Sequence, residues 1–245
     1  MKNDAEQKGN KPATINRLLA TLKHMFSKAL DWEMVEEETL KRIKRVKLLE
    51  ENNRRLRFLS KEECQKLVEN SDSHLKPIVI LALNTGMRKA EILNLTRDKV
   101  DFRHGFILLD RTKNGERREI PLNETAKQVL LTQIKTLHLQ HFFYDPHTEK
   151  PYKDVKRSFS TACRRAGIKD FHFHDLRHTF ASHLVMAGQD LTTVKELLGH
   201  KTLTMTLRYS HLAPAHKVKA VELLDSVLNT STAQKLHNFE VIKND

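Results

Sequence analysis

The feature that most constrains the fold is one hairpin signal in a chain whose other apolar patterns are helical. Two short runs, Phe106–Leu109 and Arg118–Leu122, have the composition and length of strands, and Asn114-Gly115 lies between them. Asn-Gly suits a tight hairpin turn because both central positions of that turn need positive φ. We therefore expect a mainly α fold with a small antiparallel β-sheet, which is an α+β class.

A first helix is expected near the N-terminus, where apolar residues recur at helical spacing. Thr14 is the expected cap of this helix. The apolar positions are Ile15, Leu18, Leu22, Met25, Phe26 and Leu30. A short helix running into a linker is expected after it, because the apolar period fades beyond Leu49.

A second group of helices should begin at Ser60-Lys61-Glu62-Glu63, which has the form of a capping box. A domain boundary is expected just before it. Further helices are expected over Leu75–Leu83, closed by Gly86, and onward through Leu93. Asn123 can cap another helix. Three glycines stand where later helices should end, Gly167, Gly188 and Gly199.

The balance of charge favours a polyanionic partner. Lys and Arg number 43 against 31 Asp and Glu, a formal charge of +12, and the isoelectric point is near 9.7. Nucleic acid is the commonest partner of so basic a protein, and a basic enzyme with another substrate is the alternative. Much of the excess lies in one stretch, which is either a solvated face or a segment that follows DNA. Its candidate DNA-binding residues are Lys41, Arg42, Lys44, Arg45, Lys47, Arg54 and Arg55.

The small number of cysteines and the lack of a long apolar run indicate the cellular compartment. Cys64 and Cys163 are the two cysteines, and they form no short motif, so neither a disulfide framework nor a zinc ribbon is expected. Residues 1–10 are polar and unlike a signal peptide, and no apolar run is long enough for a membrane span. We expect a protein of the reducing cytoplasm.

The segment from Asn84 to Leu93 contains the first candidate for chemistry. Arg88 should open a helix after a glycine turn, where a cation opposes the helix dipole and gains little by itself. Beside a bound phosphate it is well placed, because a guanidinium can bind two oxygens at once. Glu91, one turn later, can hold Arg88 in place. The alternative is a surface ion pair.

Lys113 is the second candidate, at the tip of the expected hairpin. A lysine with a lowered pKa can protonate an alkoxide leaving group. The alternative is an exposed lysine in a turn.

The third candidate is the segment Phe171–Thr179. If the chain is helical from His174, then Arg177 lies one turn on and on the same face, and a base beside a guanidinium suits attack on a phosphodiester. His172, His174 and His178 also allow a metal site, although no cysteine or patterned carboxylate completes a ligand set.

The last candidates are His200, which follows the helix-ending Gly199, and Tyr209, which lies nine residues later beyond another short helix. Tyr144 and Tyr152 have no histidine or arginine motif beside them. The alternative for Tyr209 is a half-buried packing residue with a satisfied hydroxyl.

Taken in order, these segments resemble the tyrosine recombinase or phage integrase family. The matching motifs are Thr-Gly-Met-Arg with Glu91, Thr-Lys-Asn-Gly, His-Asp-Leu-Arg-His-Thr-Phe-Ala-Ser, and Leu-Leu-Gly-His followed by Tyr209. The resemblance covers Phe58–Leu212 and, less distinctly, Ala13–Leu49.

The resemblance implies a role for each residue. Arg88 and Arg177 clamp the oxygens of the scissile phosphate, and His200 donates to it. Tyr209 attacks phosphorus and forms a 3′-phosphotyrosine, while Lys113 protonates the leaving 5′ oxygen. His174 assists as a base or donor, and Glu91 supports Arg88. Arginines supply the positive charge and the covalent link keeps the bond energy, so we expect no metal, ATP or other cofactor.

The resemblance also implies an organisation. Residues 1–57 correspond to a partial helical core-binding region with a basic linker. Residues 58–212 correspond to the catalytic domain, and residues 213–245 to a C-terminal helix and tail. Double-stranded DNA is the expected partner, bound in the bacterial nucleoid by a dimer or tetramer. The C-terminal helix is expected to join the copies, through Val218, Val221, Leu224, Val227 and Leu228.

Three other readings remain open at the level of sequence. A type IB topoisomerase-like enzyme would use nearly the same residues to relax DNA without exchanging strands. A degenerate regulator would bind DNA without cutting it. A metal hydrolase would use the histidine cluster and lose activity on treatment with a chelator.

Overall fold

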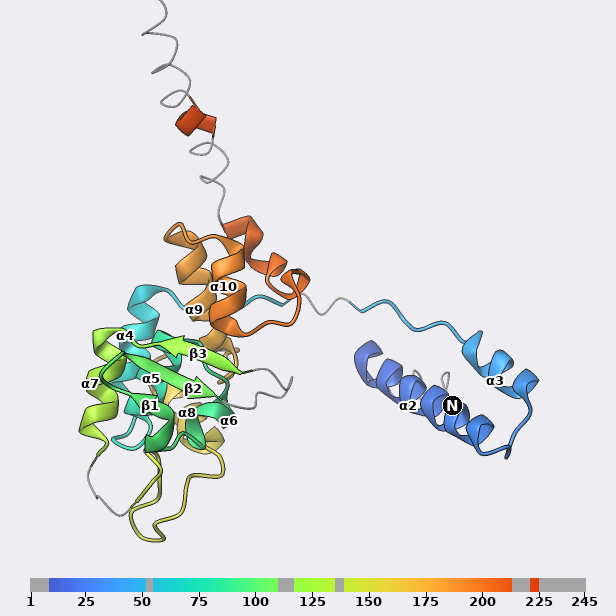
Figure 1. Ribbon diagram of the computed structural model, residues 1–245, viewed down its shortest axis with the longest axis horizontal. Coiled ribbons are helices and arrows are strands. Elements are labelled where there is room, and N and C mark those ends of the chain that lie inside the picture. The colour runs from blue at the N-terminus through green and yellow to red at the C-terminus, as the bar shows by residue number, and fades with distance from the viewer. Residues whose placement is uncertain (1–8, 52–54, 110–116, 135–138, 213–220, 225–245) are drawn as a thin grey trace, which may run out of the picture. The chain divides into compact units, whose positions relative to one another are not determined.

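The computed structural model describes residues 9–51, 55–109, 117–134, 139–212 and 221–224 (Figure 1). The chain divides into two compact units, Met1–Arg55 and Leu56–Asp245. Within the described residues, no helix has the length and apolar character needed to cross a membrane.

The described part of the first unit contains two helices, α2 (Pro12–Asp31) and α3 (Glu37–Lys44). Ile15 and Leu19 of α2 are buried, as is Leu40 of α3. The helix at this place was predicted, but two details were wrong. Pro12 occupies the first turn, with Lys11 as N-cap, so Thr14 lies inside the helix and does not cap it. Leu18 and Met25, both expected on the apolar face, are exposed.

Asn16 fixes the chain that follows α3. Its side-chain amide donates to the Leu49 carbonyl over 2.8 Å and to Glu51 over 2.6 Å, and its oxygen accepts from the Leu49 amide. The basic residues on and after α3 are exposed, namely Lys41, Arg42, Lys44, Arg45, Lys47 and Arg55. Arg54 lies outside the described residues.

The second unit is mainly helical, as predicted from the sequence. Among the described residues, its α-helices are α4 (Lys61–Glu69), α5 (Lys76–Thr85), α6 (Lys89–Leu93), α7 (Glu124–Thr132), α8 (Lys156–Arg165), α9 (Asp175–Met186) and α10 (Leu191–Leu198), and residues 221–224 are helical as well. Three 3-10 turns accompany them, η1 (Arg97–Lys99), η2 (Leu203–Met205) and η3 (Leu207–Leu212). The capping box at Ser60 is confirmed, because Ser60 accepts from the Glu63 amide and Glu63 accepts from the Ser60 amide.

A three-stranded antiparallel sheet completes this unit, in the order β1 (Val100–Asp101), β2 (Phe106–Leu109) and β3 (Arg118–Pro121). The pairing of β2 with β3 was predicted. Strand β1 was missed because two residues are too short to show a period of two. Leu109 pairs with Arg118, so residues 110–116 connect the two strands, and this segment, with Asn114-Gly115, lies outside the described residues.

The core of the second unit surrounds α5, which packs against α7 and α9 (Figure 1). Ile78, Val79 and Leu81 of α5 are fully buried. The start of the unit is fastened to α9, because the Leu59 amide donates to Thr179 over 3.1 Å and the Leu59 carbonyl faces a His183 ring nitrogen at 2.9 Å. These two contacts fix the position of α9 relative to the start of the unit.

Candidate active site

The turn between α5 and α6 positions Arg88. Gly86 ends α5 with φ of +60°, and an added Cβ there would lie 2.4 Å from the Phe180 ring, so both the conformation and the space favour glycine. Arg88 then caps α6. Its amide donates to Glu91 over 2.8 Å and its guanidinium donates to the other Glu91 oxygen over 2.7 Å. The predicted pairing of Arg88 with Glu91 is present, and the pair is partly buried rather than on the open surface.

Helix α9 positions Arg177, which is 3% exposed. His174 is the N-cap of α9, as the sequence indicated. The Arg177 guanidinium donates to the Gly86 carbonyl over 2.7 Å and to the Leu198 carbonyl. Burial, with the charges of Arg88 and Arg118, lowers the pKa of Arg177 to about 9, which leaves a cation at neutral pH. The Arg177 guanidinium is therefore fixed in place by two carbonyls, remains charged, and can bind an anion.

The end of α10 positions His200. Gly199 terminates the helix with φ of +59°, and His200 follows it with a ring nitrogen 2.9 Å from the Thr206 hydroxyl. Burial, followed by the charges of Arg177 and Arg88, lowers the pKa of His200 to about 4. The ring is therefore neutral at physiological pH and able to donate from one nitrogen.

Tyr209 lies in η3 and is 1% exposed. Its hydroxyl lies 2.6 Å from Nδ1 of His178. Burial raises the pKa of Tyr209 to about 12, although Arg208 and Arg177 act in the opposite direction. Burial and the neighbouring His174 lower the pKa of His178 to about 4. The phenol is thus protonated and the imidazole neutral, and the imidazole tautomer decides which of the two groups donates.

One cavity of about 350 Å³ brings the candidates together. It is lined by Arg88, His174, Arg177, His178, His200, Thr204, Met205, Arg208 and Tyr209. Five of the six catalytic candidates therefore line one cavity, together with His178, and Glu91 contacts Arg88. Lys113 lies outside the described residues.

Sequence reasoning gave no role at the tyrosine to His178 and did not consider Arg118. His178 was noted only as part of a possible metal cluster. One signal for it was available, because His174 and His178 are four residues apart and share a helix face, and their ring centroids lie 5.2 Å apart. Arg118 contacts Leu198 and Glu91, residues distant in the sequence, and no local pattern indicates those contacts.

Three guanidiniums, those of Arg88, Arg177 and Arg208, lie with neutral histidines and a phenol around one cavity, and this set suits the chemistry of a phosphate ester. The arginines can neutralise and orient the anion, and the phenol can act as a nucleophile once it loses its proton. Among the described residues, no group of three or more His, Cys, Asp or Glu side chains is arranged to hold a metal ion.

Comparison with known families gives a direct match. The model of the phage integrase family matches residues 57–216. The chain belongs to the phage integrase family. This match spans every candidate catalytic residue, including Lys113.

Two curated relatives show how much of a phage integrase family protein is present. The integrase of Salmonella phage P22 is 33% identical over 221 residues, which are 85% of this chain and 56% of that protein. The shufflon-specific DNA recombinase of Escherichia coli is 32% identical over 207 residues, which are 82% of this chain and 52% of that protein. The chain thus spans little more than half the length of these relatives.

Solved structures agree with the fold. The catalytic domain of bacteriophage HP1 integrase matches with a TM-score of 0.56 and 32% identity, over 70% of this chain and 96% of that one. The Tn1549 transposon integrase in complex with transposon right end DNA matches with a TM-score of 0.73 over 91% of this chain and 83% of that one. At 21% identity, the second likeness concerns the fold alone.

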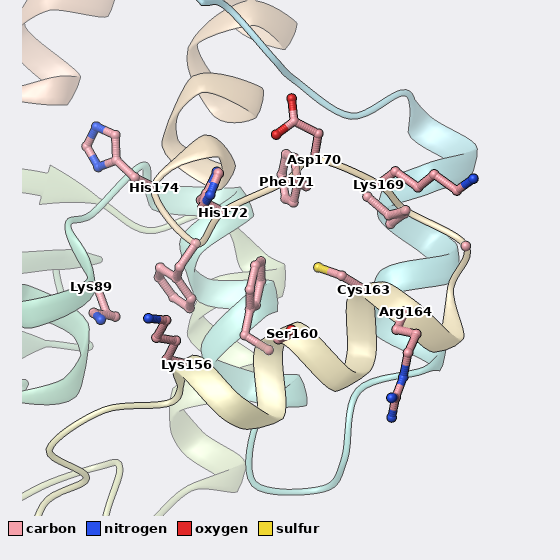
Figure 2. A pocket seen from close by; sticks show the side chains of 14 residues that line it. Lys89, Lys156, Ser160, Cys163, Arg164, Lys169, Asp170, Phe171, His172 and His174 are labelled. Atoms are coloured by element: carbon pink, nitrogen blue, oxygen red, sulfur yellow. The ribbon is translucent and has the colours of Figure 1, made fainter. Parts of the chain in front are cut away.

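A larger cavity of about 890 Å³ adjoins the site and shares His174 with it. Its apolar lining includes Phe159 and Phe171. Lys89 and His174 lie at one end and Lys169 and Arg164 at the other (Figure 2). Cys163 also lines it, but burial raises the pKa of this thiol to about 11, so it is an inert side chain rather than a nucleophile.

Proposed function

We propose that this chain is a site-specific DNA recombinase that cuts and rejoins DNA through a 3′-phosphotyrosine at Tyr209. The observation that supports this most strongly is the cavity in which the Tyr209 hydroxyl meets His178, beside Arg88 and Arg177. Family membership supports the same reaction, and the curated relatives are an integrase and a DNA recombinase.

In this proposal the cations bind the scissile phosphate. Arg88 and Arg177 clamp its non-bridging oxygens, and His200 donates a further hydrogen bond from its neutral ring. The existing hydrogen bonds to Glu91, Gly86 and the end of α10 hold the guanidiniums before DNA arrives. Such preorganised charge is the main source of catalysis in phosphoryl transfer.

The bonds change in one exchange. The Tyr209 oxygen attacks phosphorus, the new P–O bond forms, and the bond from phosphorus to the 5′ oxygen breaks. The tyrosine proton passes to a histidine, and the 2.6 Å contact supports His178 as the first acceptor, with His174 one helix turn away as an assisting base. Lys113 gives a proton to the 5′ oxygen. The bond energy stays in the phosphotyrosine, so rejoining is the reverse step and needs no metal or nucleotide cofactor.

The proposed partners are double-stranded DNA and further copies of the chain. The lambda integrase(75-356) dimer was crystallised bound to a COC′ core site, which supports assembly on DNA for a protein of this fold. We assign the contact between copies to the C-terminal helix. Residues 221–224 are helical, and Val221, Leu223 and Leu224 are exposed. The other residues named for this helix, including Val218, Val227 and Leu228, lie outside the described part.

The proposed division of labour follows the chain. Residues 1–57 serve as a partial core-binding region, with the exposed basic residues on and after α3 contacting the DNA backbone. Residues 58–212 carry the reaction, and residues 213–245 join the copies. The protein acts on cytoplasmic DNA, and its two free cysteines suit a reducing compartment.

Covalent trapping tests this function. The protein is mixed with a supercoiled plasmid carrying the genomic DNA that flanks its gene, quenched in detergent, and examined for protein that migrates with DNA. Wild type, Tyr209→Phe and the control Tyr152→Phe are compared, each with and without a chelator. We expect an adduct that requires Tyr209, survives Tyr152→Phe and ignores the chelator.

The same assay separates the alternatives. Relaxation of plasmid without exchange of strands indicates the topoisomerase-like reading. Loss of cleavage in chelator indicates the hydrolase reading. Binding without any adduct contradicts the proposal and indicates a regulator.

A further inference from the structure

We propose that Arg118 is a positioning residue for the site: it fixes the turn that carries His200 and the carboxylate that orients Arg88. This inference rests on the proposed function and adds to it a part played by β3. Arg118 does not line the cavity that holds Tyr209, so its influence on a bound phosphate passes through the residues it contacts.

The Arg118 side chain connects β3 with the end of α10 and with α6. The side chain is 7% exposed. Its Nη1 donates to the Leu198 carbonyl over 2.8 Å, and its Nη2 donates to Glu91 over 3.2 Å. A buried guanidinium with these two acceptors cannot turn away without leaving its own charge and N–H groups without partners, which is costly inside a protein.

The carbonyls at the end of α10 are shared among three arginines. Leu198 accepts from both Arg118 and Arg177, and Gly199 accepts from Arg88 over 3.4 Å. The C-terminal end of a helix carries partial negative charge, so cations are favoured there. His200 is the next residue, and the place of this turn therefore decides where its ring lies.

Gly199 allows the close approach of Arg118. A Cβ added at Gly199 would lie 2.6 Å from Cδ and 2.7 Å from Nη1 of Arg118. No other residue type would leave room for the arginine and adopt the φ of +59° without strain. The glycine at the end of α10 is therefore what allows the Arg118 side chain to pack against this turn.

Arg118 also favours the ionised form of Glu91. Burial raises the pKa of Glu91, but the charge of Arg118, followed by the hydrogen bonds from Arg88, outweighs burial and leaves that pKa below its ordinary value. Glu91 must be ionised to hold the amide and the guanidinium of Arg88 together. Removing the charge of Arg118 weakens the support of Arg88 as well as the turn at His200.

The position of Arg118 on β3 adds a connection to the hairpin. Arg118 pairs with Leu109, which is the last pair before the segment that contains Lys113. The residue whose side chain contacts the end of α10 therefore also forms, through its backbone, the last pair of the β2–β3 ladder.

A matched pair of variants tests the idea. Arg118→Gln removes the buried guanidinium, and Arg117→Gln removes the same charge from an exposed neighbour on the chain. Arg118→Lys keeps the charge but not the fork. We measure the single-turnover rate of adduct formation on a nicked duplex from the flanking genomic DNA, and the dissociation constant for that duplex.

We expect Arg118→Gln to slow adduct formation about 10- to 100-fold, since displacement of a catalytic group by about 1 Å can cost about 100-fold. DNA binding should stay within about twofold, because Arg118 makes no contact with DNA in this account. Arg117→Gln should behave as wild type, and Arg118→Lys should recover part of the rate.

A spectroscopic measurement on the free protein makes the result independent of DNA. The imidazole nitrogen shifts of His200, assigned with His200→Gln, report its contact with Thr206. We expect them to change in Arg118→Gln and to stay constant in Arg117→Gln.

Unchanged His200 shifts in a folded Arg118→Gln protein would overturn the inference, as would an adduct rate equal to that of Arg117→Gln. A slow rate caused entirely by weaker DNA binding would also overturn it. If wild type forms no adduct, the proposed function fails, and the His200 shifts still decide whether Arg118 positions the turn.

Discussion

Acidification should destabilise the second unit through His178. The side chain is 7% exposed and neutral in the folded protein, with a pKa of about 4 against an ordinary value of 6.5. A pKa lowered by folding contributes stability that is fully present above pH 6.5 and is lost as pH falls through 4. Protonation would place a new cation among His174, Arg208 and Arg177, and Nδ1 of His178 could then act only as a donor toward the Tyr209 oxygen.

The size of this effect follows from the two pKa values. Their difference, at ~1.4 kcal/mol for each pH unit, amounts to about 3 kcal/mol for complete protonation. About 2 kcal/mol of this should be lost by pH 5, because the unfolded chain is then already protonated while the folded chain is not. For a domain of ordinary stability, this is a large fraction of the free energy of unfolding.

The measurement is urea unfolding at pH 7.5 and pH 5, followed by far-UV circular dichroism, with amide hydrogen exchange of α9 to assign the transition to the second unit. His178→Gln should unfold with a weaker pH dependence than wild type, by about 2 kcal/mol over this range. His172→Gln, at an exposed ring, is the control and should match wild type. Equal pH dependence in wild type and His178→Gln would refute the reasoning.

Three further predictions test the supports of the site. Glu91→Gln should lower the free energy of unfolding by about 3 kcal/mol, because it removes the carboxylate that Arg88 and Arg118 share, and a denaturant titration that finds no loss would argue against the pair. Gly86→Ala should cost at least about 2 kcal/mol through its positive φ and its collision with Phe180, and an unchanged melting temperature would contradict this. Binding to duplex DNA should weaken steeply with salt through counterion release, and a flat response in fluorescence anisotropy would count against a DNA-binding protein.

Local signals predicted the boundaries of several elements. Ser60 and Asn123 cap helices through their own side chains, and Gly86 and Gly199 end helices in the left-handed region, so short stretches of sequence suffice at these places. The prediction that Thr14 caps a helix was wrong because a stronger local signal precedes it. A suitable cap residue is displaced when Pro12 starts the helix earlier.

The candidate site was predicted in part because its residues lie in short motifs in a fixed order. The structure brings Arg177, His200 and Tyr209 together from separate elements, as the resemblance implied. Contacts that depend on packing had no such signal. The hydrogen bond of His178 to Tyr209 spans 31 residues and that of Arg118 to Leu198 spans 80, and neither follows from local pattern.

The most direct test of the central claim is to identify the residue that carries DNA. The trapped adduct is digested with nuclease and trypsin and analysed by mass spectrometry. Cleavage after Arg208 and Lys217 yields a peptide that begins at Tyr209. The account predicts that this peptide carries a nucleotide through its 3′ phosphate, on the tyrosine oxygen. A nucleotide on Tyr144, Tyr152, a serine or a histidine, or an adduct that persists in Tyr209→Phe, would contradict it.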